Sequence, residues 1–299
     1  MPSPEFEAAL QHFPKDIAVP GDDFRTVRAK FEPAHGHDPG DDVAIAEVEY
    51  GGVKSLEVTP KACADTGRTV FFLHGGAFVS CPALAYTFYA AWIARAAEAR
   101  VVIVDYPLAP ERQFPAQLDA CVATYRGMLN AGIDPGAIGF TGDSCGGGMI
   151  VTTLVRLRDE GVPLPACAVS ISGWMDLEMT GDSVENPIDI DPFIDPEWIR
   201  SRARDYLGPD GDPRDPLASP IHADLSGLPP IYLQYGQNDR CRSGAVTLAD
   251  HAGRDGVEVT LEIWPGMVHG YQGMNGIAPE AGDAMARIGD YLARHVGGR

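Results

Sequence analysis

The sequence predicts an α/β fold built around a mostly parallel β-sheet. Short apolar runs that favour buried strands alternate along the chain with longer stretches that favour helices. The 299 residues are 45% hydrophobic, which provides enough apolar material for one large core. A glycine-rich turn joins an apolar strand to a helix at residues 142–146. We therefore expect a single domain over residues 1–299, with helices on both faces of the sheet.

The expected strands and helices follow one another in regular order. Residues 43–50 and 53–59 are joined by two glycines, a pattern typical of an antiparallel hairpin at the edge of a sheet. The apolar runs predict further strands at residues 70–73, 101–105, 137–141, 166–171, 231–235 and 257–264. Helical patterns lie between them, near residues 84–99, 116–130, 149–155, 242–254 and 280–295.

Two segments stand outside this alternation, at about residues 1–42 and 179–215. Both are candidates for a small cap over the sheet. A lid over a reactive centre would exclude water and supply substrate contacts, which we favour over a surface insertion without a role. For Phe193 and Trp198 individually, core packing is an equally good interpretation.

The pentapeptide GDSCG at residues 142–146 is typical of a nucleophile elbow. Such a turn strains the central Ser144 and brings Gly142 and Gly146 together, so both must be very small. The following helix would direct free amides at the reacting centre. A phosphate-binding loop is disfavoured, because the Lys-Ser/Thr of a P-loop and the dinucleotide glycine spacing are both missing. If Cys145 were the central residue, an aspartate would fall in a crowded position.

A second glycine-rich loop, HGGAF at residues 74–78, directly follows the apolar run 70–73. Backbone amides in such a loop can bind the negative charge that develops on a carbonyl oxygen during acyl transfer. An isolated loop of this kind would be an ordinary turn. The elbow downstream favours the role in acyl transfer.

A base and an acid are expected after the serine, in the order Asp or Glu and then His. His269 lies in a loop after the strand 257–264, where this kind of fold presents its base, whereas His222 is interpreted as structural. Asp239 follows the strand 231–235 and is the preferred acid, with Asp215 as a second choice. The remaining histidines precede the serine or fall in helical patterns: His12, His35, His37, His74, His251 and His295.

With these motifs identified, the chain resembles the bacterial hormone-sensitive-lipase-like esterases of the α/β-hydrolase superfamily. That family carries an HGGG-type oxyanion loop and a GDSAGG-type elbow. The likeness covers almost the whole chain and includes DYPLAPE at residues 105–111, similar to the family's DYRLAPE segment. The runs at 215–220, 228–230 and 264–269 are similar to the family's lactone-hydrolase-like members. The resemblance implies an α/β-hydrolase fold with a small helical cap.

By this resemblance, Ser144 is the nucleophile, His269 the base and Asp239 the acid of a triad that needs no cofactor. The resemblance also implies an oxyanion hole made by the amides of Gly76, Ala77 and Cys145. Two of these depart from the family, because Ala77 replaces a glycine and Cys145 an alanine. Our hypothesis is that the added methyl and thiol narrow the acyl side of the pocket or confer sensitivity to thiol reagents.

The resulting functional prediction is a serine carboxylesterase that hydrolyses small short-chain esters through an acyl-enzyme. An epsilon-lactone hydrolase and an amide-cleaving deacetylase or peptidase use the same triad and stay open as alternatives. A ligand-binding protein without activity is a third class, and the intact serine, aspartate and histidine set argues against it.

Charge and composition also limit the classes of partner and the cellular compartment that we expect for this chain. The net charge of −19 and pI near 4.6 disfavour nucleic acid and anionic membranes as partners. The amino terminus lacks a signal-peptide pattern, and six cysteines without metal-ligand spacing are consistent with reduced thiols, so we expect a cytoplasmic protein without a metal. A homodimer through the edge strand 257–264 is a hypothesis that follows from the family resemblance.

Overall fold

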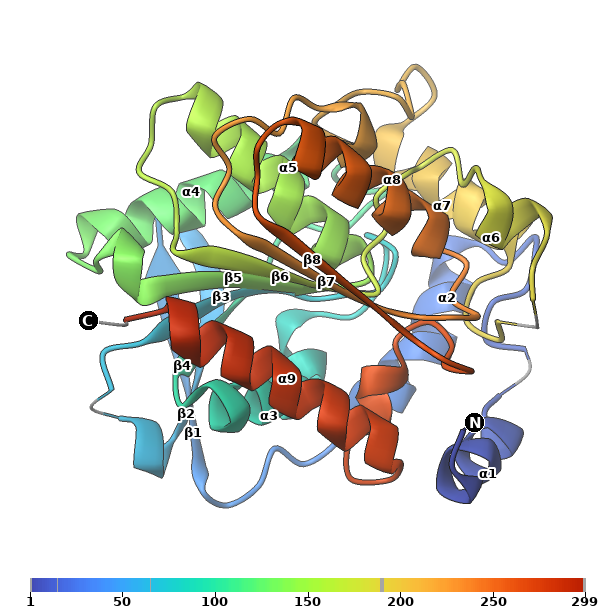
Figure 1. The fold of residues 1–299 in the computed structure, drawn as a ribbon, viewed down its shortest axis with the longest axis horizontal. Coiled ribbons are helices and arrows are strands. Elements are labelled where there is room, and N and C mark those ends of the chain that lie inside the picture. Colours follow the sequence, from blue (N-terminus) through green and yellow to red (C-terminus); the bar gives the residue numbers. More distant parts are fainter. Residues whose placement is uncertain (1, 15, 65, 189–190, 298–299) are drawn as a thin grey trace.

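The computed structural model describes residues 2–14, 16–64, 66–188 and 191–297, and it contains one twisted eight-stranded sheet (Figure 1). The strand order is β1-β2-β4-β3-β5-β6-β7-β8, and the predicted α/β class is confirmed. The strands are β1 Val43–Tyr50, β2 Val53–Pro60, β3 Thr69–Leu73, β4 Arg100–Val104, β5 Ile138–Asp143, β6 Cys167–Ile171, β7 Ile231–Gly236 and β8 Val259–Trp264.

The sheet is parallel except at its amino-terminal edge. β1 and β2 form the predicted antiparallel hairpin, and β2 pairs with β4 in antiparallel register. From β4 to β8 each neighbouring pair is parallel. Every residue of β3, β5, β6 and β7 is buried, which explains why these strands appear in the sequence as continuous apolar runs.

Helices cover both faces of the sheet, as Figure 1 shows. α3 (Thr87–Ala97) and α9 (Pro279–His295) pack together on one face, where a Cβ on Gly289 would collide with the carbonyl oxygen of Ala96. The other face carries α4 (Ala116–Asn130), α5 (Cys145–Asp159) and α8 (Arg242–Arg254). Short 3-10 helices occupy connections at Glu32–His35, Lys61–Cys63, Ala83–Tyr86, Pro135–Ala137, Pro220–His222 and Tyr271–Met274.

Two helix boundaries differ from the sequence prediction. The helix expected near 149–155 begins at Cys145, because the turn at Ser144 leads into the first helical residue without a linker. The helix expected near 84–99 is divided into a 3-10 turn, Ala83–Tyr86, and α3, which ends where Glu98 adopts a left-handed conformation with φ 49°.

The remaining helices gather at one end of the sheet (Figure 1). They are α1 (Pro4–His12), α2 (Phe24–Phe31), α6 (Asp182–Glu185) and α7 (Pro196–Leu207). All four belong to the segments 1–42 and 179–215, of which residues 1, 15, 189 and 190 lie outside the described residues. None of the helices in the described part of the chain has the length and apolar character needed to cross a membrane.

The two segments pack against each other through aromatic rings. Phe31 at the end of α2 stacks on Trp198 of α7, with ring centroids 5.5 Å apart and an interplanar angle of 4°. The ring of Phe13 lies 3.9 Å from that of Phe193. The described residues of the segments 1–42 and 179–215 therefore form one layer, which we call the cap layer.

Candidate active site

The turn between β5 and α5 has the geometry predicted for a nucleophile elbow. Ser144 has φ 52° and ψ −121°, a strained conformation for a residue other than glycine. A Cβ on Gly142 would collide with the carbonyl oxygen of Gly146, which confirms that this pair must be small. The Ser144 amide donates to the carbonyl oxygen of Ile171 at 2.9 Å, and its own carbonyl oxygen accepts from the Trp174 amide at 2.9 Å. The neighbouring strand and loop thus hold the strained turn in place.

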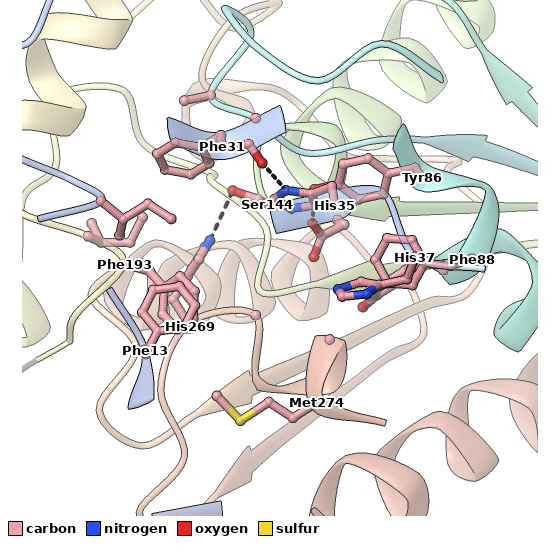
Figure 2. Close-up of a pocket in the computed structure, with 18 of the residues that line it drawn as sticks. Phe13, Phe31, His35, His37, Tyr86, Phe88, Ser144, Phe193, His269 and Met274 are labelled. Atoms are coloured by element: carbon pink, nitrogen blue, oxygen red, sulfur yellow. Dashed lines mark hydrogen bonds between the residues drawn. The ribbon is translucent and has the colours of Figure 1, made fainter. Parts of the chain in front are cut away.

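The structure brings the three predicted residues Ser144, Asp239 and His269 together in one chain of hydrogen bonds. The distance from His269 Nε2 to Ser144 Oγ is 2.9 Å (Figure 2), and the distance from His269 Nδ1 to Asp239 Oδ1 is 3.0 Å. Each residue follows a parallel strand, β5, β7 or β8, and the carboxyl ends of parallel strands meet at one edge of a sheet. The Gly270 amide donates to Ser172 Oγ at 3.0 Å, which anchors the histidine loop to the end of β6.

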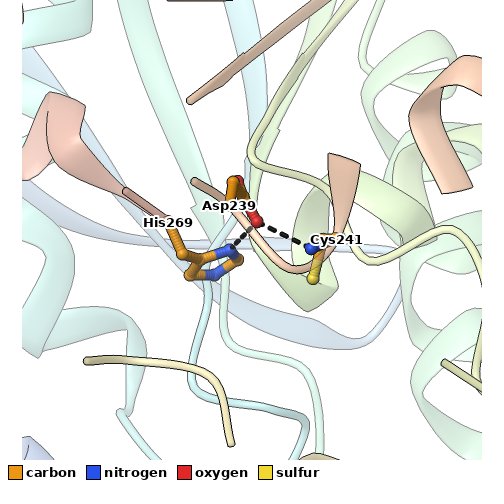
Figure 3. A group of neighbouring side chains, drawn as sticks. All are labelled: Asp239, Cys241 and His269. Atoms are coloured by element: carbon orange, nitrogen blue, oxygen red, sulfur yellow. Dashed lines mark hydrogen bonds and ion pairs between the residues drawn. The ribbon is translucent and has the colours of Figure 1, made fainter. Parts of the chain in front are cut away.

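Burial and one carboxylate determine the charge of this group (Figure 3). Burial opposes protonation of His269, but the Asp239 carboxylate more than compensates, and the pKa of the imidazole is raised well above 6.5. Asp239 is fully buried, and its Oδ1 also accepts from the Cys241 amide at 2.8 Å. Burial raises the pKa of the Cys241 thiol to about 12, so this thiol is neutral near pH 7. The Asp239 carboxylate is therefore the negative charge that stabilises the imidazolium.

The loop after β3 presents backbone amides beside the serine. Gly76 and Ala77 line the same cavity as Ser144, with φ values of 107° and 52°. The amides of Gly76, Ala77 and Cys145 donate to no oxygen among the described residues. Unpaired amides in this position can bind a developing oxyanion.

The segment at residues 105–111 supports the loop after β3 through hydrogen bonds. The Tyr106 hydroxyl donates to the carbonyl oxygen of His74 at 2.8 Å, and the Ala109 amide donates to that of Phe78 at 2.9 Å. Tyr106 also stacks on the His74 ring, and burial lowers the pKa of that imidazole to about 4. His74 is therefore neutral and part of the support of the loop.

The thiol of Cys145 packs against the loop at residues 74–78, and our hypothesis about this side chain stays a prediction that Cys145→Ala would test. Cys145 is fully buried and does not line the cavity, and its Sγ accepts from the Phe78 amide at 3.2 Å. Burial raises the pKa of the thiol to about 11, which suppresses the reactive thiolate. The methyl group of Ala77 does line the cavity. Cys145 instead supports the loop that carries the free amides.

The serine opens into an aromatic cavity of about 290 Å³. In Figure 2, Phe13 and Phe193 lie on the side of His269, whereas Tyr86 and Phe88 lie on the opposite side of Ser144. The cap layer contributes a large part of the wall, from both of its segments: Ala9, Phe13, Ile17, Phe31, His35, His37, Phe193, Ile194, Trp198 and Ile199. The segments expected to contact substrate thus surround the serine.

Asp143 and Tyr86 are cavity residues to which the sequence analysis gave no role. The Tyr86 hydroxyl donates to Asp143 Oδ2 at 2.9 Å, and burial raises the pKa of this carboxyl to about 6. Asp143 precedes Ser144 in the elbow motif, and this adjacency was a usable signal. No sequence signal pointed to Tyr86, because 57 positions separate it from Asp143 in the sequence.

The second-choice residues have other roles. Asp215 accepts from the Leu217 amide at 2.8 Å, and His222 is exposed in a 3-10 helix; neither lines the cavity. Ligand atoms of Asp239, Cys241 and His269 lie within 4.8 Å of one another and could in principle hold a metal ion. A metal there would have to break the bond between His269 Nδ1 and Asp239 Oδ1, and the arrangement fits a carboxylate that orients an imidazole better than a metal site.

Comparison with known proteins agrees with this geometry. The family model of the alpha/beta hydrolase fold matches residues 70–273. An acetyl-hydrolase of Streptomyces hygroscopicus is 36% identical over 262 residues, 88% of this chain and 85% of that protein. A solved esterase from the bacterial hormone-sensitive lipase family has a TM-score of 0.94 and 37% identity, covering 99% of this chain and 100% of its own.

A second solved esterase, EstE5 soaked by p-nitrophenyl butyrate, has a TM-score of 0.91 and 33% identity over 98% of this chain and 99% of its own. The region matched by the family model includes the elbow, both loops and most of the sheet, without β1 and β2. The chain therefore belongs to the α/β-hydrolase family, among the bacterial hormone-sensitive-lipase-like esterases, and is a carboxylic-ester hydrolase.

Proposed function

We propose that this hydrolase is a serine carboxylesterase for small, short-chain esters, with Ser144 as nucleophile, His269 as base and Asp239 as acid. The observation that carries the proposal is the 2.9 Å contact between Ser144 Oγ and His269 Nε2. His269 Nδ1 faces the Asp239 carboxylate, so the neutral imidazole holds its proton on Nδ1. Nε2 is then free to accept the serine proton.

The reaction proceeds in two halves. Ser144 Oγ attacks the ester carbonyl carbon while its proton passes to His269 Nε2, and the amides of Gly76, Ala77 and Cys145 receive the oxyanion. The imidazolium then protonates the departing alcohol and leaves an acyl-enzyme. Water, deprotonated by the same imidazole, attacks the acyl carbon. The bond to Ser144 Oγ then breaks, Oγ takes the proton back from His269, and the acid is released.

The size and chemistry of the cavity support small neutral substrates. Its volume of about 290 Å³ lies just below the range for small-molecule pockets, about 300–1,000 Å³. Its wall is mainly apolar and contains several aromatic rings, and the carboxyl of Asp143 lines it next to the serine. An acyl or alcohol group that carries a negative charge would meet repulsion there.

The test is hydrolysis of p-nitrophenyl esters from acetate to palmitate, with a lactone and p-nitroacetanilide in the same panel. We expect turnover of acetate and butyrate, a steep fall for long chains, and loss of activity in Ser144→Ala. The exposed Ser226→Ala is the matched control and should retain native rates.

Covalent labelling tests the nucleophile separately. A fluorophosphonate should modify the peptide that contains Ser144 in the native protein and in Ser226→Ala, but not in Ser144→Ala. Faster turnover of the anilide or the lactone than of any p-nitrophenyl ester would instead assign the site to the alternative chemistry. Labelling at another serine would refute the nucleophile assignment.

A further inference from the structure

The loop that carries Asp239 is tied to the cap layer by a buried carboxylate. Asp191 is only 6% exposed, and its Oδ2 accepts from the amide of Arg240 at 3.1 Å. Its Oδ1 accepts from the Phe193 amide at 3.0 Å, within the cap layer itself. One carboxylate therefore joins the cap layer to the peptide unit that directly follows Asp239.

A second tie holds the other side of the same loop. Ser183 Oγ in α6 donates to the carbonyl oxygen of Arg240 at 2.8 Å and accepts from the Ser243 amide at 3.0 Å. The Arg240 guanidinium in turn donates to the carbonyl oxygens of Ser183 and Val184 at 3.3 and 3.2 Å. Residues 239–243 are thus fixed on two sides by the segment 179–215.

The Asp239 side chain has few restraints of its own. Its Oδ1 accepts from His269 and from the Cys241 amide, but its Oδ2 has no hydrogen-bond partner among the described residues. With one oxygen unpaired, the direction of the carboxylate depends on the backbone that carries it. A shift of the Asp239 backbone would therefore lengthen the bond to His269 directly.

We propose that Asp191 is a positioning residue for the reaction, which holds the Asp239–Arg240 backbone so that the Asp239 carboxylate stays aligned with His269. The inference rests on the proposed function, because it assumes that Asp239 orients the catalytic base. Asp191 does not line the cavity, so it acts through Asp239 and not on the substrate. The cap layer then contributes to the alignment of the triad as well as to the cavity wall.

The electrostatic surroundings are consistent with this role. His269, Asp239 and the thiol of Cys241 are the titratable groups near Asp191. Burial and the nearby Asp239 charge raise the pKa of Asp191 to about 7, whereas the His269 charge and the amides of Arg240 and Phe193 favour its ionised form. Both oxygens accept amide hydrogens, an arrangement that matches a carboxylate.

Asp191→Asn tests the inference, with Asp195→Asn as the matched control. The amide of asparagine can accept with only one of its two polar atoms, so one of the two bonds from Arg240 and Phe193 is lost. We expect kcat to fall by roughly tenfold, the scale of one hydrogen bond to a charged group, while KM stays at its native value. Asp195 also accepts two amides within the cap layer, both at Oδ1, which an asparagine retains. Its variant should keep native kcat.

A double-mutant cycle with Asp239→Ala separates positioning from a general loss of structure. If Asp191 acts through Asp239, Asp191→Asn causes no further loss of kcat once Asp239 is alanine. A tenfold loss in both backgrounds would overturn the inference, and so would native kcat in a folded Asp191→Asn protein. Native kcat in Asp239→Ala alone would instead refute the acid assignment on which the inference rests.

Ser183→Ala provides a second variant if Asp191→Asn does not fold. It removes the hydroxyl that donates to the Arg240 carbonyl oxygen, on the opposite side of the loop. A kcat loss that appears in the native background but not with Asp239→Ala supports positioning by the cap layer. Unchanged kcat in folded Ser183→Ala, measured beside a native melting temperature, would count against it.

Discussion

At the scale of single residues, His269 combines full burial with a close carboxylate, two effects that act in opposite directions. Burial disfavours its charged form, and the contact with Asp239 at 3.0 Å favours it more strongly. The result is an imidazole of raised basicity that faces a serine hydroxyl. Its protonation state should therefore control the activity of the site.

We predict that kcat/KM rises with pH, with a midpoint above 6.5. The base must be neutral to accept the serine proton, so activity is lost as pH falls below the raised pKa of His269. In Asp239→Asn the charge is gone, and this acid limb should move to lower pH. The same change should reduce kcat by about 10³-fold or more, because the imidazole loses its correct tautomer.

Initial rates on p-nitrophenyl acetate across a pH series provide the measurement. Glu258→Asn is the control, because it removes an exposed carboxylate directly before β8. It should leave the midpoint in place. An acid limb at or below 6.5 in the native protein would contradict the prediction. So would a midpoint that does not move in Asp239→Asn.

The sequence was sufficient to propose Ser144, Asp239 and His269, because each follows an apolar strand in a short loop. It gave no role to Asp191 or Tyr86. Their contacts, to the Arg240 amide and to Asp143, join segments 49 and 57 positions apart. Such pairings depend on how the cap layer and the sheet meet in space, and no local pattern encodes them.

At the scale of elements, buried strands and long helices were predicted well. The bounds of α4 and α8 coincide with the sequence prediction, and the strands differ by only a few residues at their ends. Runs of consecutive apolar residues indicate strands that are buried on both faces, so the positions of these strands can be predicted from the sequence. The pairing of α2 with α7 was not predictable, because it includes the stacking of Phe31 on Trp198, two residues that are far apart in the sequence.

We predict that Phe31 and Trp198 stabilise the protein jointly. Each single alanine variant should lower the free energy of unfolding by about 3–5 kcal/mol, because Trp198 is 1% and Phe31 9% exposed. The double variant should lose less than the sum, with a coupling of about 0.5–1.5 kcal/mol for an aromatic pair. Urea denaturation of the four proteins measures this. Leu84→Ala, at a 66% exposed position, is the control and should change the free energy by less than about 0.5 kcal/mol.

A purely additive result would contradict the coupling. It would mean that α2 and α7 are each stabilised by the sheet and not by one another.

At the scale of the whole molecule, the net charge of −19 surrounds the cavity with a negative field, which adds to the short-range effect of the Asp143 carboxyl. We predict that a monomethyl ester of a small dicarboxylic acid is hydrolysed more slowly than the dimethyl ester at low ionic strength. The difference in kcat/KM should narrow as salt is added, because salt screens the long-range repulsion. The dimethyl ester, which is neutral, serves as the control for direct effects of salt on the enzyme. A ratio that does not change with salt would contradict the role of the field.

The composition of the cap layer has a consequence for how the chain is made. Phe31 emerges from the ribosome long before Trp198, and the aspartate and histidine of the site come later still. Until then, Phe31 of α2 lacks Trp198, and Phe6 of α1 lacks the apolar residues between 267 and 284 with which it clusters. Contacts between such distant positions form slowly, because a long loop must close first. The nascent chain therefore carries its serine well before it carries a working enzyme, and the window before closure is when its amino-terminal helices most need protection from aggregation.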